Sequence, residues 1–205
     1  MKVAIFGATG GTGQQLVAQA LEAGNSVQAL VRDPARLTHT NPDLTLVTGD
    51  VLDANAVSAT IQGADAVVVT LGNTANNPDW IVSDGTRVVV EAMKQQEVRR
   101  LVVVSSLGVG DSRSQVPFAF RMLMSTVLKK PMEDKERQEE LVRESGLDWI
   151  IVRPGGLTDG PKTGAYKAGA DGKIGVGQVS RADVADFVLK QLSDATYLYQ
   201  APAVA

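Results

Sequence analysis

Several short apolar runs in this chain show no alternation of polar and apolar residues, and this limits the folds that it can adopt. The clearest cover residues 66–70, with the sequence AVVVT, and residues 101–105, LVVVS. A strand that is apolar on both sides has to be buried on both faces, as in a parallel sheet covered by helices. Because stretches with helical character separate the runs, we predict an α/β fold with a doubly wound parallel sheet.

We predict six strands in the spatial order 3-2-1-4-5-6, with ligands bound beyond their carboxyl ends. The strands are expected at residues 2–6, 27–31, 44–47, 66–70, 101–105 and 149–152, and helices at 14–23, 53–61, 81–96, 117–144 and 182–192. Pro131 should break or kink the helix over 117–144. The glycine-rich stretch 155–177 is expected to be a loop with a short strand, and residues 197–200 an edge strand.

Length and composition exclude several classes of protein. A chain of 205 residues can form one domain with a sizeable core, here with a small C-terminal substrate lobe. A net charge of −3 offers no basic surface for nucleic acid, and no apolar run is long enough to span a membrane. With no cysteine and only His39, neither a disulfide nor a zinc site is expected. We therefore expect a cytoplasmic, metal-free monomer.

The most specific motif follows the first apolar run. It is the glycine-rich turn Gly7-Ala8-Thr9-Gly10-Gly11-Thr12-Gly13, which lies between a predicted strand and a predicted helix. Gly7 permits a sharp turn, Gly10 lets the backbone approach a phosphate, and Gly13 lets the helix pack closely. The free N–H groups at the start of the helix then face the anion. The whole turn, including Thr9, Gly11 and Thr12, predicts a binding site for the diphosphate of a dinucleotide.

The residue after the second strand indicates which dinucleotide is bound. Arg32 lies nineteen residues beyond Gly13. An arginine suits the 2′-phosphate of NADP, whereas an acid would bind the ribose hydroxyls of NAD. Asp33 is such an acid, but it precedes Pro34 and is also a typical turn residue. We favour NADPH/NADP, with a solvated surface arginine as the alternative for Arg32.

The ends of the next two strands supply further candidates for the cofactor site. Asp50 follows the third strand and can accept a hydrogen bond from the adenine amino group, while Val51 offers a backbone N–H and an apolar wall. The alternative for Asp50 is a helix cap or a turn. Leu71 and Gly72 follow the fourth strand, where a glycine lets the backbone pass beside a ribose.

Hydroxyl and amino groups are expected at the end of the fifth strand. Ser105 and Ser106 can bind a substrate carbonyl or the nicotinamide ribose, or they can satisfy backbone groups, and Ser106 is the catalytic candidate. Lys135 is placed for a ribose contact, although the charge-rich helix around it is also typical of a solvated face. The carboxylates of that helix are not expected to form an acid/base pair.

Large apolar residues crowd the start of the same predicted helix. They can form core, or they can form an adaptable surface for a flat ligand, because methionine changes its shape easily. These residues are Phe118, Phe120, Met122, Leu123 and Met124.

Together with Ser145-Gly146-Leu147, Arg153-Pro154-Gly155 and Ser180-Arg181-x-Asp183-Val184-Ala185, these motifs resemble those of atypical short-chain dehydrogenases/reductases. The stretches 4–10, 30–33, 49–52, 141–147 and 163–166 resemble the biliverdin-IXβ reductase/flavin reductase family. The resemblance covers residues 2–192. It implies one Rossmann-like domain over residues 1–205, with the substrate pocket between the loop 155–177 and the helix start 111–130.

The same resemblance implies an NADPH-dependent reductase that acts on a planar tetrapyrrole or flavin. Arg32 would bind the 2′-phosphate, Pro154 would contact the cofactor, and Ser106 would be the pocket serine. Two positions differ from relatives. Pro131 stands where the Tyr-x-x-x-Lys dyad of ordinary members would place tyrosine, and Gly156 stands where family members carry a histidine.

Loss of the tyrosine argues against ketone or alcohol chemistry, since a general acid typically contributes 10²–10⁴-fold. Hydride transfer to a bilin or a flavin such as FMN tolerates that loss, because conjugation spreads the charge and solvent can deliver the proton. The alternatives are an NmrA-like redox sensor, which binds NADP(H) without catalysis, and an epimerase or lyase that acts on sugar nucleotides.

Overall fold

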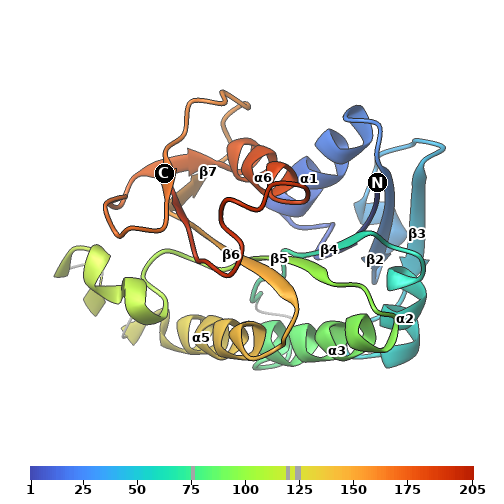
Figure 1. Ribbon diagram of the computed structural model, residues 1–205, viewed down its shortest axis with the longest axis horizontal. Coiled ribbons are helices and arrows are strands. Elements are labelled where there is room, and N and C mark those ends of the chain that lie inside the picture. Colours follow the sequence, from blue (N-terminus) through green and yellow to red (C-terminus); the bar gives the residue numbers. More distant parts are fainter. Residues whose placement is uncertain (75–76, 119–120, 123–125) are drawn as a thin grey trace.

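The computed structural model describes residues 1–74, 77–118, 121–122 and 126–205. One main sheet runs through it, with helices on both faces (Figure 1). Its strands lie in the order β3 (Leu44–Thr48), β2 (Ser26–Val31), β1 (Lys2–Phe6), β4 (Ala66–Val69), β5 (Arg100–Val104), β6 (Asp148–Pro154), β10 (Ala203–Val204) and β8 (Ala168–Gly169). The predicted α/β class and the order of the first six strands are confirmed. All pairs from β3 to β10 are parallel, and only β8 is antiparallel to its neighbour.

The central strands are buried on both faces, as their composition predicts. On β4, Ala66 and Val68 point into one apolar cluster, and Val67 and Val69 point into the other. Successive side chains of a strand face opposite sides, so one strand contributes to two cores. Figure 1 shows the two layers: α1 (Gly11–Glu22) and α6 (Arg181–Lys190) cover one face, and α2 (Ala54–Ile61), α3 (Ile81–Gln95) and α5 (Lys129–Arg143) cover the other.

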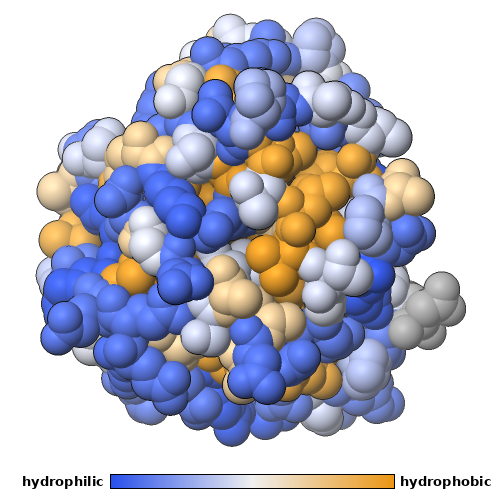
Figure 2. All heavy atoms as spheres, turned by 90° about the vertical axis from the view of Figure 1, so that its right-hand side faces the viewer, coloured by the Kyte–Doolittle hydropathy of each residue, from blue (hydrophilic) through white to orange (hydrophobic). Residues whose placement is uncertain are grey.

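The edge strand β3 closes both cores on its side of the sheet. Leu44 and Leu46 pack against the cluster beneath α1 and α6, while Val47 packs against the opposite cluster. Figure 2 views the molecule from this side and shows apolar atoms gathered in a band that hydrophilic residues surround. None of the helices in the described ranges combines the length and the apolar character that crossing a bilayer requires.

The helix expected over 117–144 is broken before Pro131, as predicted, and is not kinked there. The expected helix over 117–144 is divided: Arg121 N–H donates to Pro117 O in an earlier helical turn, and α5 begins at Lys129. Pro131 therefore lies in the first turn of α5, where a missing N–H costs no intrahelical hydrogen bond. Of the apolar residues expected there, Phe120, Leu123 and Met124 lie outside the described residues.

The C-terminal part of the chain corrects one prediction and extends another. The expected edge strand over residues 197–200 does not form: residues 197–199 are in a turn, in which Tyr199 adopts a left-handed backbone with φ 59°. The strand comes later, as β10 beside β6. The stretch 155–177 holds two short strands instead of one: β8, and β7 (Gly156–Thr158), which pairs with β9 (Gln178–Ser180) in a small separate sheet.

Candidate functional site

The glycine-rich turn between β1 and α1 has two positions where a side chain would meet a neighbouring backbone segment. Gly7 has φ 91°, and a Cβ there would lie 2.7 Å from the carbonyl carbon of Thr70 at the end of β4. A Cβ at Gly13 would lie 2.1 Å from Gly7 O. Both glycines are therefore required by close contact of backbone segments. Gly10 differs, because a Cβ there would meet only Gly7 O at 3.4 Å.

The start of α1 leaves an open site for an anion. The first hydrogen bond of the helix runs from Gln14 N–H to Gly10 O at 2.8 Å, so the N–H groups of Gly11, Thr12 and Gly13 have no acceptor within the helix. Gly10 provides no side-chain cap, and the first turn has no acidic residue. Thr9 contributes its carbonyl, which accepts from Gln14 Nε2 at 3.1 Å. Free N–H groups at a positive helix end fit a phosphate.

Arg32 and Asp33 differ in what they are free to bind. Arg32 is exposed, directly after β2, and no partner lies within hydrogen-bond distance of its side chain in the part of the chain that is described. Asp33 accepts from Ala35 N–H at 3.0 Å and so caps a short 3₁₀ helix, Pro34–Arg36. Of the two alternatives for Asp33, the structure supports the turn residue.

The ends of β3 and β4 meet at α3. Asp50 Oδ1 accepts from Leu52 N–H at 2.9 Å, which closes the turn before α2. Val51 is buried, and its Cγ1 would lie 2.7 Å from a Cβ at Gly85, with Leu71 Cδ1 at 3.1 Å. Gly85 of α3 was missed by the sequence analysis, although a glycine inside a predicted helix is itself a signal of close packing. Gly72 has open space where a side chain would be.

The serines after β5 lie against the end of β6. Ser105 N–H donates to Val152 O at 2.8 Å, and Leu107 N–H donates to the carbonyl of the buried Pro154 at 2.9 Å. Ser106 Oγ donates to Leu107 O at 3.2 Å. Ser105 Oγ is buried without a hydrogen-bond partner among the described residues. A buried hydroxyl without a partner is uncommon, and it fits a ligand group at this position.

Lys135 joins this group of residues from α5. Its Nζ donates to Val104 O at 3.2 Å, at the last residue of β5. Burial lowers the pKa of Lys135 to about 8, although the carboxylates of Glu139 and Asp134 act to raise it. The helix face that carries it is therefore packed against the sheet and is not the solvated face of the alternative reading.

Two carboxylates near Lys135 have structural partners that the sequence did not indicate. Asp134 is buried and accepts from the N–H groups of Val82 and Ser83 at 3.0 and 2.8 Å, at the start of α3. Glu139 is buried and accepts from Arg153 Nε at 3.0 Å. These bonds hold α5 against α3 and β6. No group of acidic or histidine residues in the described ranges has the geometry to hold a metal ion.

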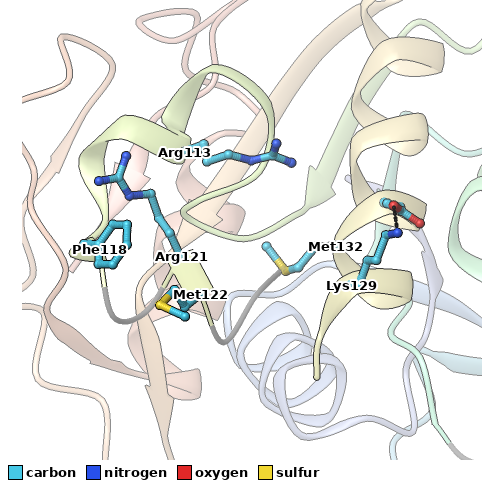
Figure 3. A pocket seen from close by; sticks show the side chains of 7 residues that line it. Arg113, Phe118, Arg121, Met122, Lys129 and Met132 are labelled. Atoms are coloured by element: carbon cyan, nitrogen blue, oxygen red, sulfur yellow. Dashed lines mark ion pairs between the residues drawn. The ribbon is translucent and has the colours of Figure 1, made fainter. Parts of the chain in front are cut away.

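A pocket of about 400 Å³ lies between the residues before α5 and its first turn (Figure 3). Arg121 stacks its guanidinium over the Phe118 ring at 5.6 Å, and Lys129 pairs with Glu133 at 3.8 Å. Arg113, Met122 and Met132 complete the lining. The expected apolar residues Phe118 and Met122 therefore face this pocket, within the segment 111–130. No residue of the loop 155–177 is among its described lining residues.

The pocket lies near the end of β5. Met132 packs against the apolar cluster of Leu107, Val116 and Ala203, and Leu107 follows the two serines. Lys135 is one helical turn further along α5. Ser105, Lys135 and Pro154 are thus brought together, as are Val51 and Leu71. Arg32 and Asp50 lie at the ends of neighbouring parallel strands, on the same edge of the sheet as the other candidates.

The chain is similar to known proteins over almost its whole length. A protein family described as NAD(P)H-binding matches residues 7–195. An uncharacterized chloroplastic protein of Arabidopsis thaliana is 31% identical over 93% of this chain and 71% of its own length. Reductase pytE of Aspergillus terreus is 28% identical over 93% of this chain and 90% of its own.

Solved structures show the same fold. ChuY, an anaerobilin reductase from Escherichia coli O157:H7, is 26% identical with a TM-score of 0.83, and the match covers 100% of this chain and 96% of ChuY. A short-chain dehydrogenase/reductase from Veillonella parvula, solved in complex with NADP, is 20% identical with a TM-score of 0.83 and coverages of 100% and 94%. The second likeness concerns the fold alone.

Proposed function

This chain belongs to the NAD(P)H-binding family, and on that premise we propose that it is an NADPH-dependent reductase whose acceptor is a flat conjugated molecule, either a bilin or a flavin such as FMN. The name of the ChuY relative, an anaerobilin reductase, supports the bilin. The name of the Aspergillus relative supports reduction in general. NADPH supplies a hydride when it is bound.

In this proposal, the chain holds the cofactor along the carboxyl edge of its sheet. The N–H groups of the glycine-rich turn bind the diphosphate, and Arg32 binds the 2′-phosphate. Asp50 and Val51 lie beside the adenine, and Leu71 and Gly72 beside the ribose. The nicotinamide end lies near Ser105, Lys135 and Pro154, where the free Ser105 hydroxyl and the Lys135 ammonium can donate hydrogen bonds.

The preference for NADPH rests on Arg32 and Asp33. Arg32 is exposed at the end of β2, whereas the carboxylate of Asp33 is engaged by the turn that follows. A hydrogen bond to a charged group contributes roughly 1.5–3 kcal/mol, which corresponds to about a tenfold to hundredfold preference. Arginine also matches the geometry of a phosphate with two parallel donors.

The pocket beside the end of β5 is the main support for a flat conjugated acceptor. Phe118, Met122 and Met132 offer adaptable apolar contacts for a flat ring system, and methionine suits varied ring shapes. Of the three cationic side chains in the lining, Lys129 pairs with Glu133 and Arg113 pairs with Glu136 at 3.3 Å. Arg121, which stacks on Phe118, is therefore the cation best placed for an anionic substituent of the acceptor. Bilins carry carboxylates, and FMN carries a phosphate.

The hydroxyl groups of all three tyrosines donate hydrogen bonds to other groups of the chain, which favours an acceptor whose reduction needs no tyrosine as general acid. Tyr166 donates to Asp186 at 2.8 Å, Tyr197 to Ala168 O at 3.2 Å, and Tyr199 to Asp148 at 2.9 Å. Asp148 begins β6 and so lies at the opposite edge of the sheet. In a bilin or a flavin, conjugation spreads the charge, and Ser106 can order the water that delivers the proton.

Steady-state oxidation of NADPH with biliverdin IXβ, FMN and riboflavin tests this proposal. We expect turnover with at least one acceptor. If FMN is reduced, Arg121→Ala should raise the KM for FMN toward that for riboflavin, which lacks the phosphate. NADPH binding without oxidation by any of the three would contradict the reductase and favour a redox sensor.

A further inference from the structure

The side chain of Arg181 lies against the glycine-rich turn of the proposed cofactor site. It is the first residue of α6 and comes from the motif Ser180-Arg181-x-Asp183. A Cβ at Gly11 would lie 2.6 Å from Arg181 Cδ and 2.9 Å from its Nε. A buried hydrogen bond from Gln19 Nε2 to Ala182 O, at 2.8 Å, joins the later part of α1 to the start of α6. Gly11 is therefore the residue that lets an arginine side chain cross the start of α1.

Positive charge is concentrated at the start of α1, and no acidic residue of its first turn balances it. The start of α1 carries the positive end of the helix dipole and three N–H groups without helical acceptors. A guanidinium beside a positive helix end is unfavourable unless an anion faces both. Arg181 has one ion-pair partner in the described residues, Asp159, at 2.6 Å. That carboxylate belongs to the stretch after β7, and its side chain is 88% exposed.

Because the Asp159 carboxylate is exposed to water, its pair with the partly buried Arg181 contributes little to stability and is easily exchanged for another anion. A diphosphate on the N–H groups of Gly11, Thr12 and Gly13 would lie within the same concentration of positive charge. Guanidinium groups bind phosphate oxygens through paired, charge-assisted hydrogen bonds.

We propose that Arg181 is a second diphosphate-binding group: it binds the cofactor diphosphate opposite the glycine-rich turn and exchanges Asp159 for it. This inference rests on the nucleotide site of the proposed function, but not on the identity of the acceptor. The start of α6 does not depend on Arg181, because Ser180 Oγ caps it by accepting from Asp183 N–H at 2.9 Å. A substitution at Arg181 should therefore leave the helix in place.

Isothermal titration calorimetry with NADP⁺, NAD⁺ and 2′-AMP tests the proposal in three variants. Arg181→Gln should weaken NADP⁺ and NAD⁺ by the same factor, about tenfold to hundredfold, because both carry the diphosphate. Binding of 2′-AMP, which has no diphosphate, should not change. Asp159→Asn should tighten NADP⁺ binding, because it removes the competing anion. The double variant should bind like Arg181→Gln alone.

Arg32→Ala is the matched control, since it should weaken NADP⁺ and 2′-AMP but not NAD⁺. Unchanged affinity in Arg181→Gln, or an equal loss for 2′-AMP, would overturn the proposal. An Asp159→Asn variant that does not bind NADP⁺ more tightly would overturn the exchange. Failure of the wild-type protein to bind any nucleotide would overturn the cofactor site itself. Binding without reduction of an acceptor would instead reject only the reductase.

Discussion

Gly10 and Gly13 lie in one turn, but a side chain at each would meet different surroundings. At Gly13 a Cβ would overlap Gly7 O, at 2.1 Å, whereas at Gly10 the same atom lies 3.4 Å away and φ is −77°. We expect Gly13→Ala to lower the free energy of unfolding by about 1–3 kcal/mol, because the added methyl group overpacks the turn. Gly10→Ala should keep its stability but lose nucleotide affinity, since its methyl group occupies the path of the phosphate.

Urea denaturation and NADP⁺ titration of the two variants separate these effects. Equal loss of stability in both variants would contradict the different roles of the two glycines. Full affinity in Gly10→Ala would mean that no phosphate approaches the backbone at this residue.

We predict that Arg32 determines the selectivity for NADP⁺ over NAD⁺. Arg32→Ala should raise the Kd for NADP⁺ about tenfold to hundredfold and leave the Kd for NAD⁺ unchanged, because only NADP⁺ has the 2′-phosphate. The measurement is a titration with both nucleotides. Lys94→Ala, at the far end of α3, is the control for a general loss of positive charge. Equal losses of affinity for both nucleotides would mean that Arg32 does not bind the 2′-phosphate.

At the scale of elements, the contact between α5 and β5 predicts a dependence on pH. Burial lowers the pKa of Lys135 to about 8, whereas the lysine of an unfolded chain keeps its proton to about 10.4. Between these values the unfolded state binds more protons, so this group makes the protein more stable as pH rises from 8 to 10. Below pH 8, Lys135 is charged in both the folded and the unfolded state, so the folded protein bears the full free-energy cost of burying that charge.

Urea unfolding at pH 7, 8, 9 and 10 of the wild type and Lys135→Met measures this effect. The free energy of unfolding of the wild type should rise relative to that of the variant above pH 8. A constant difference across the series would show that Lys135 has an ordinary pKa and is not buried against β5.

The junction between α6 and the loop 155–177 depends on one carboxylate. Asp183 accepts from the N–H groups of Thr163 and Gly164, both at 2.8 Å, and from the hydroxyls of Thr163 and Ser180. Although burial alone would raise the pKa of Asp183, these hydrogen bonds outweigh burial and lower it. Asp183→Ala should cost about 1.5–3 kcal/mol per charged hydrogen bond lost, and it should release the loop.

Limited proteolysis tests this anchoring, with cleavage expected within residues 160–177 in the variant before the rest of the chain. Asp171→Ala is a suitable control, because among the described residues the side chain of Asp171 bonds to its near neighbour Lys173 alone. Equal protection of the loop in wild type and Asp183→Ala would contradict the role of the carboxylate.

For the molecule as a whole, we expect one cooperative unfolding transition that nucleotide shifts upward. The two apolar clusters lie on opposite faces of the same sheet, so neither persists without it. NADP⁺ at 100 times its Kd should add about 2.7 kcal/mol and raise the Tm by roughly 5–10 °C. Differential scanning calorimetry measures both. Two separate transitions would contradict a single domain.

Much of this molecule follows from short-range patterns in its sequence. The runs around Val67 and Val102 have no polar face, which is typical of central strands, and their alternation with helices predicts a doubly wound sheet with the order 3-2-1-4-5-6. The glycine spacing from Gly7 to Gly13 predicts the turn because its constraint is local. Asp33 before Pro34 is a turn residue for the same reason.

The features that sequence reasoning missed or left open depend on contacts between distant segments. A charged residue on a helix has the same local pattern whether it faces water or a strand, and only packing placed Lys135 on β5, Asp134 on α3 and Glu139 on Arg153. The late strand β10 forms only because β6 offers free backbone groups to a segment some fifty residues later. Periodicity and turn chemistry therefore determined the sheet and its glycine-rich turn. Tertiary packing alone decided which charged groups reach the site, since their burial depends on which surfaces meet.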